Sequence, residues 1–502
     1  LLAGLSPIVN LTPEQIKAKY ANAKPDWYVP IADVPFEISQ ANQDVLSLPG
    51  FDLRSKAVRV YNGLAPHTIG YVSLISPDTA QQWKDLGYRG DEWVGASGLE
   101  EWGEPYLAGT HGGTLSIISA QGTVVKTMAK QDAVPSRSIY TTLNRTLQEA
   151  TDKILEGHKG AIVVLDPKTG QVLALSSYPS FNPNALITSN VVDVPTETSF
   201  LNRATQGAYP PGSTFKPVTM AAGLEKGGLK PTSPFYDPGY WDGLGAGYRK
   251  VCWLASGHGN IDLQTGLSAS CDVVFYQVGK IVDDIDPMIL PTFARDFGLG
   301  ATTGITGLAE VAGLIPDPNW KLSTQNDAWR TGDAVNMAIG QGYVQVTPLQ
   351  LARMYAAIAN GGTLYRPEIV LKIGSSNEPP EEVFQPDAQG QLPISPDNLK
   401  SIQNGLHGVI VSPRGTAGFV FRGFPYSVAG KTGTAETGGP NDVSHAWFVA
   451  YAPFEDPKIL VLVFLENGGQ GSYNAAPLAR NVLETYFSLP YTPPPTVPPS
   501  GP

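Results

Sequence analysis

The chain lacks three features that would assign it to a simple class. Among its 502 residues, no apolar run approaches the length of about 20 residues that a transmembrane helix needs. Its formal charge of −11 argues against a general nucleic-acid binder. It has only two cysteines, and no internal repeat is evident. The hydrophobic content of 42% is that of a globular protein, and the length predicts two or three domains with a sizeable core.

The most informative segment spans residues 209–217 and reads Tyr-Pro-Pro-Gly-Ser-Thr-Phe-Lys-Pro. Two prolines and a glycine break the chain before an apolar run, which predicts that a helix begins here. Because positions three apart share one face of a helix, Lys216 can reach the hydroxyl of Ser213. A serine becomes nucleophilic when a base takes its proton, and a lysine serves if burial or neighbouring charge lowers its pKa. Alone, such a pair is also typical of ordinary helix surfaces.

Two later motifs follow, in the order typical of penicillin-recognising serine enzymes. They are Ser270-Cys271-Asp272 and Lys431-Thr432-Gly433-Thr434. Ser270 can relay a proton to a leaving amine, and Lys431 supplies positive charge for a substrate carboxylate. Gly433 lets a ligand backbone lie close to a strand edge, because it has no side chain. The N–H group of Thr434 can complete an oxyanion hole with that of Ser213.

On these three motifs the chain resembles the class B penicillin-binding proteins, the D,D-transpeptidases that cross-link peptidoglycan. The resemblance extends over most of the chain, through residues 160–175, 202–204, 340–350 and 445–448. Residues 237–241 and 257–259 resemble the elongation-type members of the class. The resemblance implies an α+β fold, in which a penicillin-binding, serine β-lactamase-like domain holds an antiparallel sheet between helical layers. It also implies an N-terminal, non-catalytic pedestal.

The resemblance implies acyl transfer from a D-Ala-D-Ala stem peptide, through an acyl-enzyme on Ser213, to an amine of a neighbouring stem. Two alternatives stay open. One is a serine β-lactamase or β-lactam sensor, which would need a way to activate water that we do not find. The other is an idle scaffold that activates a cell-wall glycosyltransferase, which the intact motifs speak against.

The expected partners are peptidoglycan stem peptides, β-lactam antibiotics and a membrane glycosyltransferase of the shape, elongation, division and sporulation family. The family is extracytoplasmic and normally carries one N-terminal membrane anchor. We find neither that anchor nor the family's early Arg-Gly-rich segment, so we expect a truncated chain.

The sequence divides into three expected parts. Residues 1–155 form the pedestal, residues 156–489 hold all three motifs, and residues 490–502 are a proline-rich tail expected to be disordered. The expected strands of the middle part are 161–165, 172–176, 445–452 and 459–465. Its expected helices follow Ser213, flank Ser270 and span 349–359 and 477–487.

Asp272 stands where many relatives have asparagine. An amide can donate a hydrogen bond, whereas an ionised carboxylate only accepts. A carboxylate close to Lys216 would favour the protonated lysine. Because aspartate also occurs here in elongation-type members, we keep the predicted activity and leave the proton path open.

Both cysteines, Cys252 and Cys271, belong to a set that includes Asp237 and His258. Thiolate, imidazole and carboxylate groups are zinc ligands, and four of them close a tetrahedral structural site. Some elongation-type relatives carry zinc near the active site, and the spacing here resembles theirs. A disulfide and free thiols are the alternatives. Adjacent helical side chains diverge by about 100°, so Cys271 would point away from the cleft and the metal would fix the helix that presents the second motif.

Overall fold

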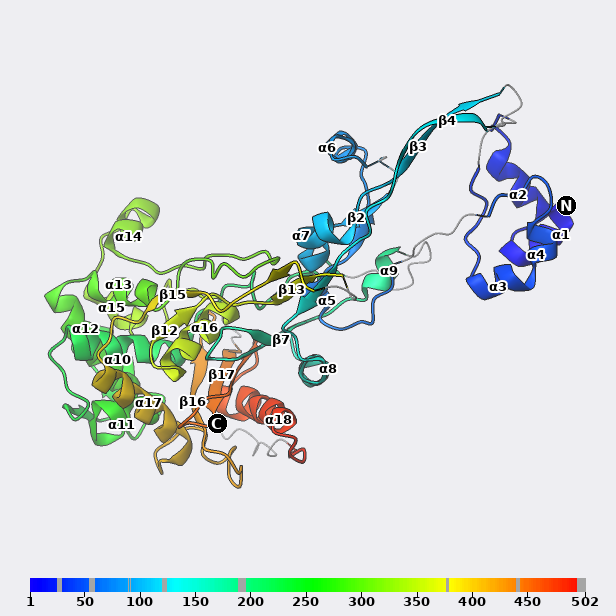
Figure 1. Ribbon diagram of the computed structural model, residues 1–502. Helices are drawn as coiled ribbons and strands as arrows, with labels where there is room; N and C mark the ends of the chain where they lie inside the picture. The colour runs from blue at the N-terminus through cyan, green and yellow to red at the C-terminus, as the bar shows by residue number, and fades with distance from the viewer. Residues whose placement is uncertain are drawn as a thin grey trace. The chain divides into compact units, whose positions relative to one another are not determined.

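The computed structural model describes residues 1–24, 29–53, 59–88, 90, 92–119, 124–187, 196–375, 379–438 and 443–493. These residues form a small unit, Leu1–Val60, and a large unit that begins at Tyr61 (Figure 1). Of the predicted proline-rich tail, residues 494–502 lie outside the described part. Among the described residues, none of the helices combines the length and apolar character needed to cross a membrane.

The small unit consists of short helices around a small apolar core. Thr12 caps the second helix, because its side chain accepts a hydrogen bond from the N–H group of Gln15. Buried Leu5, Ile16 and Leu46 pack together and hold the helices. The helices are α1 (Leu2–Val9), α2 (Pro13–Tyr20), α3 (Phe36–Ala41) and α4 (Gln43–Leu46).

The first part of the large unit carries short strand pairs. β1 (Val72–Leu74) pairs with β2 (Trp93–Gly95), and β3 (Gly113–Ile118) pairs with β4 (Val124–Gln131). β5 (Ser138–Thr141) joins strands from much later in the chain, β13 (Val370–Gly374) and β14 (Glu382–Val383). This three-stranded sheet joins two segments that lie far apart in the sequence of the large unit. The helices here are α5 (Pro66–Ile69), α6 (Ala80–Asp85) and α7 (Gly98–Leu107).

A five-stranded antiparallel sheet forms the centre of the large unit, in the order β16-β17-β18-β6-β7. Its central strand, β18, reads Ile-Leu-Val-Leu-Val-Phe-Leu, and all 7 residues are buried. A strand that is apolar on both faces needs a cover on both faces. The strands are β16 (Ala429–Ala435), β17 (His445–Ala452), β18 (Ile459–Leu465), β6 (Gly160–Leu165) and β7 (Val172–Tyr178).

Helices supply that cover, which confirms the predicted sheet between helical layers. One face packs against α8 (Arg145–Leu155) and α18 (Ala476–Tyr486) through side chains such as Ile162 and Val463. The alternate side chains, such as Val163 and Phe464, join a larger core on the other face. That core includes α10 (Lys216–Glu225), α11 (Leu263–Ser268), α12 (Asp272–Ile285), α16 (Pro348–Ala359) and α17 (Pro396–Val411).

The predicted strands and helices of the middle part correspond to observed elements. The two predicted strands 445–452 and 459–465 have the bounds of β17 and β18. The predicted helices 349–359 and 477–487 match α16 and α18 to within one residue at each end. Further elements of this part include α9 (Pro183–Ile187), α13 (Ile289–Asp296), α14 (Pro318–Gln325), α15 (Thr331–Met337), β12 (Thr363–Tyr365) and β15 (Ala388–Gln391).

Candidate active site

The turn that carries Ser213 lies directly against β16. A 3₁₀ turn, Gly212–Phe215, leads into α10 and leaves Ser213 half-buried. Gly212 has a φ of 53°, and a Cβ atom there would lie 2.7 Å from the carbonyl oxygen of Thr434. Only glycine permits both this backbone conformation and this close approach. The first and third motifs are therefore in contact, as their predicted roles require.

The ammonium group of Lys216 is fully buried and is held by the second motif. Its Nζ donates to the carbonyl oxygen of Ser270 at 2.7 Å, to Ser270 Oγ at 3.3 Å and to Asp272 Oδ1 at 2.7 Å. Lys216 and Asp272 thus form a buried ion pair. Among the described residues, the structure shows no hydrogen bond between Lys216 and Ser213 Oγ. The hydrogen bonds of its amine go instead to Ser270 and Asp272.

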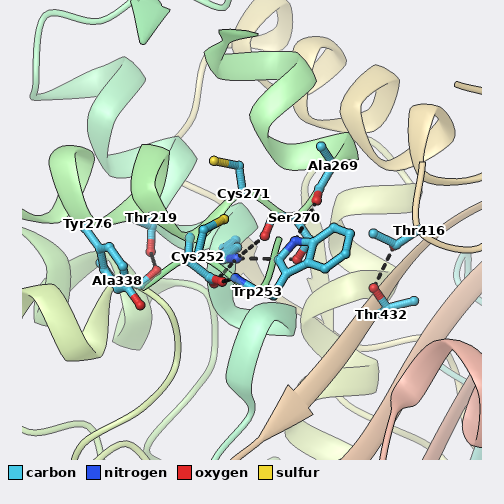
Figure 2. A network of polar contacts seen from close by, with 12 residues as sticks. Thr219, Cys252, Trp253, Ala269, Ser270, Cys271, Tyr276, Ala338, Thr416 and Thr432 are labelled. Atoms are coloured by element: carbon cyan, nitrogen blue, oxygen red, sulfur yellow. Dashed lines mark hydrogen bonds and ion pairs between the residues drawn. The ribbon is translucent and has the colours of Figure 1, made fainter. Parts of the chain in front are cut away.

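Ser270 lies in the turn between α11 and α12, with a φ of 56°. This left-handed conformation is uncommon for serine and is typical of positions that the surrounding structure constrains. Only Asp272 of this motif is helical, because Cys271 is the N-cap residue of α12. The argument that Cys271 diverges from Ser270 on a helix is therefore wrong in its premise. Its outcome holds, since the sulfur of Cys271 points away from Ser270 (Figure 2) and toward Asp237.

Lys431 brings a second amine to the hydroxyl of Ser270. The side chain is fully buried, and its Nζ donates to Ser270 Oγ at 2.7 Å and to the carbonyl oxygen of Thr432 at 3.0 Å. Burial, and then the charge of Lys216, lower the pKa of Lys431 well below its usual range. Lys431 therefore holds its proton less firmly than an exposed lysine does. Ser270 Oγ connects two amines, one from each of the other motifs.

β16 presents the third motif along the edge of the sheet. In the sheet order it pairs with β17 only, so its other edge is unpaired within the described sheet. Gly433 is packed so tightly that a Cβ atom would lie 2.8 Å from the side chain of Thr214. Thr434 is exposed, and Thr432 Oγ1 shares a 2.7 Å hydrogen bond with Thr416 Oγ1. An extended ligand can therefore pair with this edge through its backbone.

The four predicted metal ligands come together behind the second motif. They lie on four separate segments: the end of β8 (Pro234–Asp237), the loop after β10 (Lys250–Val251), the loop before β11 (Gly259–Asp262) and the N-cap of α12. One donor atom from each residue lies within 4.8 Å of all the others. These residues are Asp237, Cys252, His258 and Cys271.

The distances among these donor atoms fit a tetrahedral zinc site. His258 Nδ1 lies 2.7 Å from Asp237 Oδ2, Cys271 Sγ lies 3.2 Å from the same oxygen, and Cys252 Sγ lies 3.6 Å from His258 Nδ1. Zinc bonds of 2.0–2.3 Å give tetrahedral edges of roughly 3.3–3.8 Å, so small adjustments suffice. Both cysteines are free. The hydrogen bond between the two thiols lowers the pKa of Cys252 and raises the pKa of Cys271, so Cys252 is the first of the pair to become a thiolate.

Trp253 joins the four predicted metal ligands to the second motif, and the sequence analysis missed it. Its backbone N–H group donates to Asp272 Oδ2 at 3.1 Å, and its indole Nε1 donates to the carbonyl oxygen of Ala269 at 3.1 Å (Figure 2). Asp272 thus accepts one hydrogen bond from Lys216 and one from Trp253. The only signal in the sequence was the position of Trp253 directly after the predicted ligand Cys252.

The chain matches two family models. The model described as the penicillin binding protein transpeptidase domain matches residues 160–484, and the one described as the penicillin-binding protein dimerisation domain matches residues 1–141. The peptidoglycan D,D-transpeptidase MrdA of Haemophilus influenzae is 34% identical over 96% of this chain and 78% of its own length. The Escherichia coli K12 protein of the same name is 30% identical over 96% of this chain and 80% of its own length.

Solved structures agree with this assignment. Pseudomonas aeruginosa PBP2 in complex with WCK 5153 is 33% identical, with a TM-score of 0.73 over 84% of this chain and 88% of its own. The complex between PBP2 and MreC from Helicobacter pylori gives 26% identity and a TM-score of 0.79 over 97% of this chain and 91% of the matched chain. With its motifs gathered at the edge of an antiparallel sheet and both domains matched, the chain belongs to the penicillin-binding protein transpeptidase family.

Proposed function

We propose that this chain is a peptidoglycan D,D-transpeptidase of cell-wall elongation that works through an acyl-enzyme on Ser213. The observation that carries the proposal is the convergence at Ser270 Oγ, where Lys216 and Lys431 meet next to the turn of Ser213. Three motifs far apart in the sequence thereby supply a nucleophile, a base and a proton relay to one site. The MrdA relatives, which are named as peptidoglycan D,D-transpeptidases, support the same activity.

In the first half-reaction, Ser213 Oγ attacks the carbonyl carbon of the penultimate D-alanine. For this step the proton that Lys216 holds in the ion pair with Asp272 must first leave. Lys216 then takes the proton of Ser213, and Asp272, 2.7 Å from Lys216 Nζ, stabilises the ammonium that results. The backbone N–H groups of Ser213 and Thr434 stabilise the oxyanion. The C–N bond then breaks, and Ser270 passes a proton to the departing amine of D-alanine.

In the second half-reaction, an amine of a neighbouring stem attacks the ester carbonyl and regenerates the hydroxyl of Ser213. Before acylation, the donor stem pairs with the free edge of β16. A β-lactam carries a reactive amide that the same serine can open, which gives an acyl-enzyme of the opened drug in place of the acyl-enzyme of the stem peptide.

We also propose that Asp237, Cys252, His258 and Cys271 hold one zinc ion. Four protein ligands leave no open coordination position, so the ion would be structural and would not activate water. It would cross-link the loops of the β8–β11 segment to the N-cap of α12, next to Ser270 and Asp272. Cys271, inside the second motif, would thereby be tied to the loop that carries Cys252.

The remaining parts of the proposal concern partners and location. One solved relative is titled as a complex of PBP2 with MreC, and another as part of a peptidoglycan synthase complex that polymerises and cross-links. These support an assembly of this chain with other proteins of wall synthesis. On the family resemblance alone, we propose that the N-terminal part of the chain contacts a membrane glycosyltransferase of the shape, elongation, division and sporulation family. Such an enzyme would be extracytoplasmic and anchored in the cell membrane.

Labelling with a fluorescent penicillin tests the activity against its alternatives. Stable labelling supports the transpeptidase, since its acyl-enzyme waits for an amine. Rapid loss of the label would identify a β-lactamase. Absence of labelling in folded protein would identify an idle scaffold.

A further inference from the structure

A two-stranded ribbon beside the second motif has two unlike faces. β9 (Tyr240–Trp241) pairs antiparallel with β10 (Lys250–Val251), and the N–H group of Cys252 continues the ladder to the carbonyl oxygen of Gly239 at 2.9 Å. Successive side chains of a strand point to opposite faces. The outer face carries Tyr240 and Val251, which lie opposite each other in the ladder. Together with the exposed Trp253, two residues beyond the end of β10, we name them the ridge.

The inner face fixes the ribbon onto the helix that begins with Asp272. Trp241 stacks on Tyr276 of α12, with 6.0 Å between ring centroids and 27° between planes. The hydroxyl of Tyr276 donates to the carbonyl oxygen of Val251 at 3.1 Å. Cys252 also points inward, toward His258. The ribbon is therefore a firm support, and its ridge keeps a fixed position relative to the second motif.

The ridge itself is apolar and uncovered. Tyr240 is 38% exposed, Val251 68% and Trp253 56%. At one end the guanidinium group of Arg249 lies 4.1 Å from the ring centroid of Tyr240, with Asp242 3.8 Å from Arg249. At the other end Trp253 is bonded to Asp272 and to Ala269, the neighbour of Ser270. An exposed apolar surface that adjoins a catalytic site and has a cation at one end is typical of a surface that binds substrate.

The chemistry of the site indicates which substrate lies there. The donor stem is expected along β16, on the sheet side of the site, whereas Ser270 and Trp253 belong to the helical side. The leaving amine takes its proton through Ser270, and by microscopic reversibility the attacking amine gives up its proton along the same route. The incoming amine therefore approaches Ser270 from the side on which the ridge lies.

We propose that the ridge binds the acceptor stem, the peptide whose amine attacks the acyl-enzyme; this rests on the transpeptidase function proposed above. Methyl groups and the extended backbone of a peptide pack against the indole of Trp253 and the ring of Tyr240. A carboxylate of the stem pairs with Arg249. Trp253 is thus a specificity-determining residue for the second half-reaction.

The experiment compares two acceptors in the full chain, with a thioester donor to form the acyl-enzyme. One acceptor is free D-alanine, which is too small to reach along the ridge, and the other is a stem tetrapeptide with a free side-chain amine. For Trp253→Ala and for Tyr240→Ala, we expect the concentration of tetrapeptide that gives half-maximal aminolysis to rise about tenfold, as loss of one aromatic contact implies. The corresponding value for D-alanine should change far less.

Ile285→Ala is the matched control. Ile285 is 59% exposed, like the ridge residues, but it ends α12, whose 14 residues place it about 20 Å from Asp272. It should leave both acceptors unaffected. Because Tyr240 does not contact the second motif, its variant separates lost binding from a disturbed Asp272.

Two results would overturn the inference. One is an equal loss for D-alanine and tetrapeptide, or a loss confined to acylation by the donor, which would place the ridge in the donor site. The other is that aminolysis by both acceptors stays unchanged in the ridge variants while penicillin still labels the protein normally. That result contradicts the inference about the ridge but leaves the transpeptidase proposal standing. If penicillin fails to label the unsubstituted protein, the transpeptidase proposal fails and the ridge inference fails with it.

Discussion

Removal of the carboxylate of Asp272 tests the geometry of the site most stringently. In Asp272→Ala, the fully buried ammonium of Lys216 loses the partner that lies 2.7 Å away. Breaking a buried ion pair by removing one member costs about 3–5 kcal/mol, because the remaining charge stays in a medium of low dielectric. For a chain of 502 residues, that loss lowers the melting temperature by on the order of 3–5 °C.

The same helix supplies the control. Lys280 and Asp284 form an exposed pair one turn apart on α12, with a nitrogen–oxygen distance of 2.6 Å. Asp284→Ala should cost only about 0.3–0.5 kcal/mol, because water screens the pair. Both variants share one helix and one type of substitution, so the difference between them reports burial of the charge.

Urea-induced unfolding of the two variants gives the comparison, and Lys216→Met combined with Asp272→Ala closes a double-mutant cycle. The double variant should recover much of the stability that Asp272→Ala loses, since it buries no unpaired charge. Equal costs for Asp272→Ala and Asp284→Ala would refute the buried ion pair. The pair would also be refuted if the double variant lost as much stability as Lys216→Met and Asp272→Ala lose separately, added together.

Three further predictions follow from the same contacts. Protein purified without chelator should contain about one equivalent of zinc, and Cys252→Ser should lower both the zinc content and the melting temperature; less than about a tenth of an equivalent, with a Cys252–Cys271 disulfide seen by mass spectrometry, would replace the metal by a covalent link. Lys431→Met should abolish acylation. Because burial lowers the pKa of Lys431 in the folded state, the unfolded chain binds that proton more tightly. The free energy of unfolding of the unsubstituted protein therefore rises with pH, up to the unfolded pKa of about 10.4. Any stability advantage of Lys431→Met, measured by unfolding at several pH values, should shrink over that range. Gly212→Ala should slow penicillin acylation, measured by stopped-flow fluorescence, on the order of 100-fold or more, because its Cβ atom would meet the Thr434 carbonyl oxygen at 2.7 Å and move Ser213; an unchanged rate would contradict the contact between these motifs.

The sequence predicted the central strands well, because they are apolar runs with clear ends. β17 and β18 are buried on both faces, and Gly, Pro or Asp residues bound them. It did not predict β3 and β4, whose residues are almost all exposed and show no alternation of buried and exposed positions. Periodicity carries information only where one face of an element is buried.

The candidate site divides in a similar way. Ser213, Lys216 and Lys431 could be selected from the spacing and the order of the three motifs alone. The left-handed turn at Ser270 could not, since nothing local requires a serine to adopt a φ of 56°. The contact between Trp253 and Asp272 joins residues 19 positions apart and exists only once the ribbon has packed on α12.

Intact-protein mass spectrometry after treatment with benzylpenicillin tests the central claim, that Ser213 is the acylated nucleophile. The unsubstituted protein should gain the mass of one penicillin, and peptide mapping should place it on the segment that contains Ser213. Ser213→Ala, which removes only the hydroxyl, should remain folded and show no adduct. An adduct of the same mass on Ser213→Ala, or one mapped to another segment of the unsubstituted protein, would contradict the account.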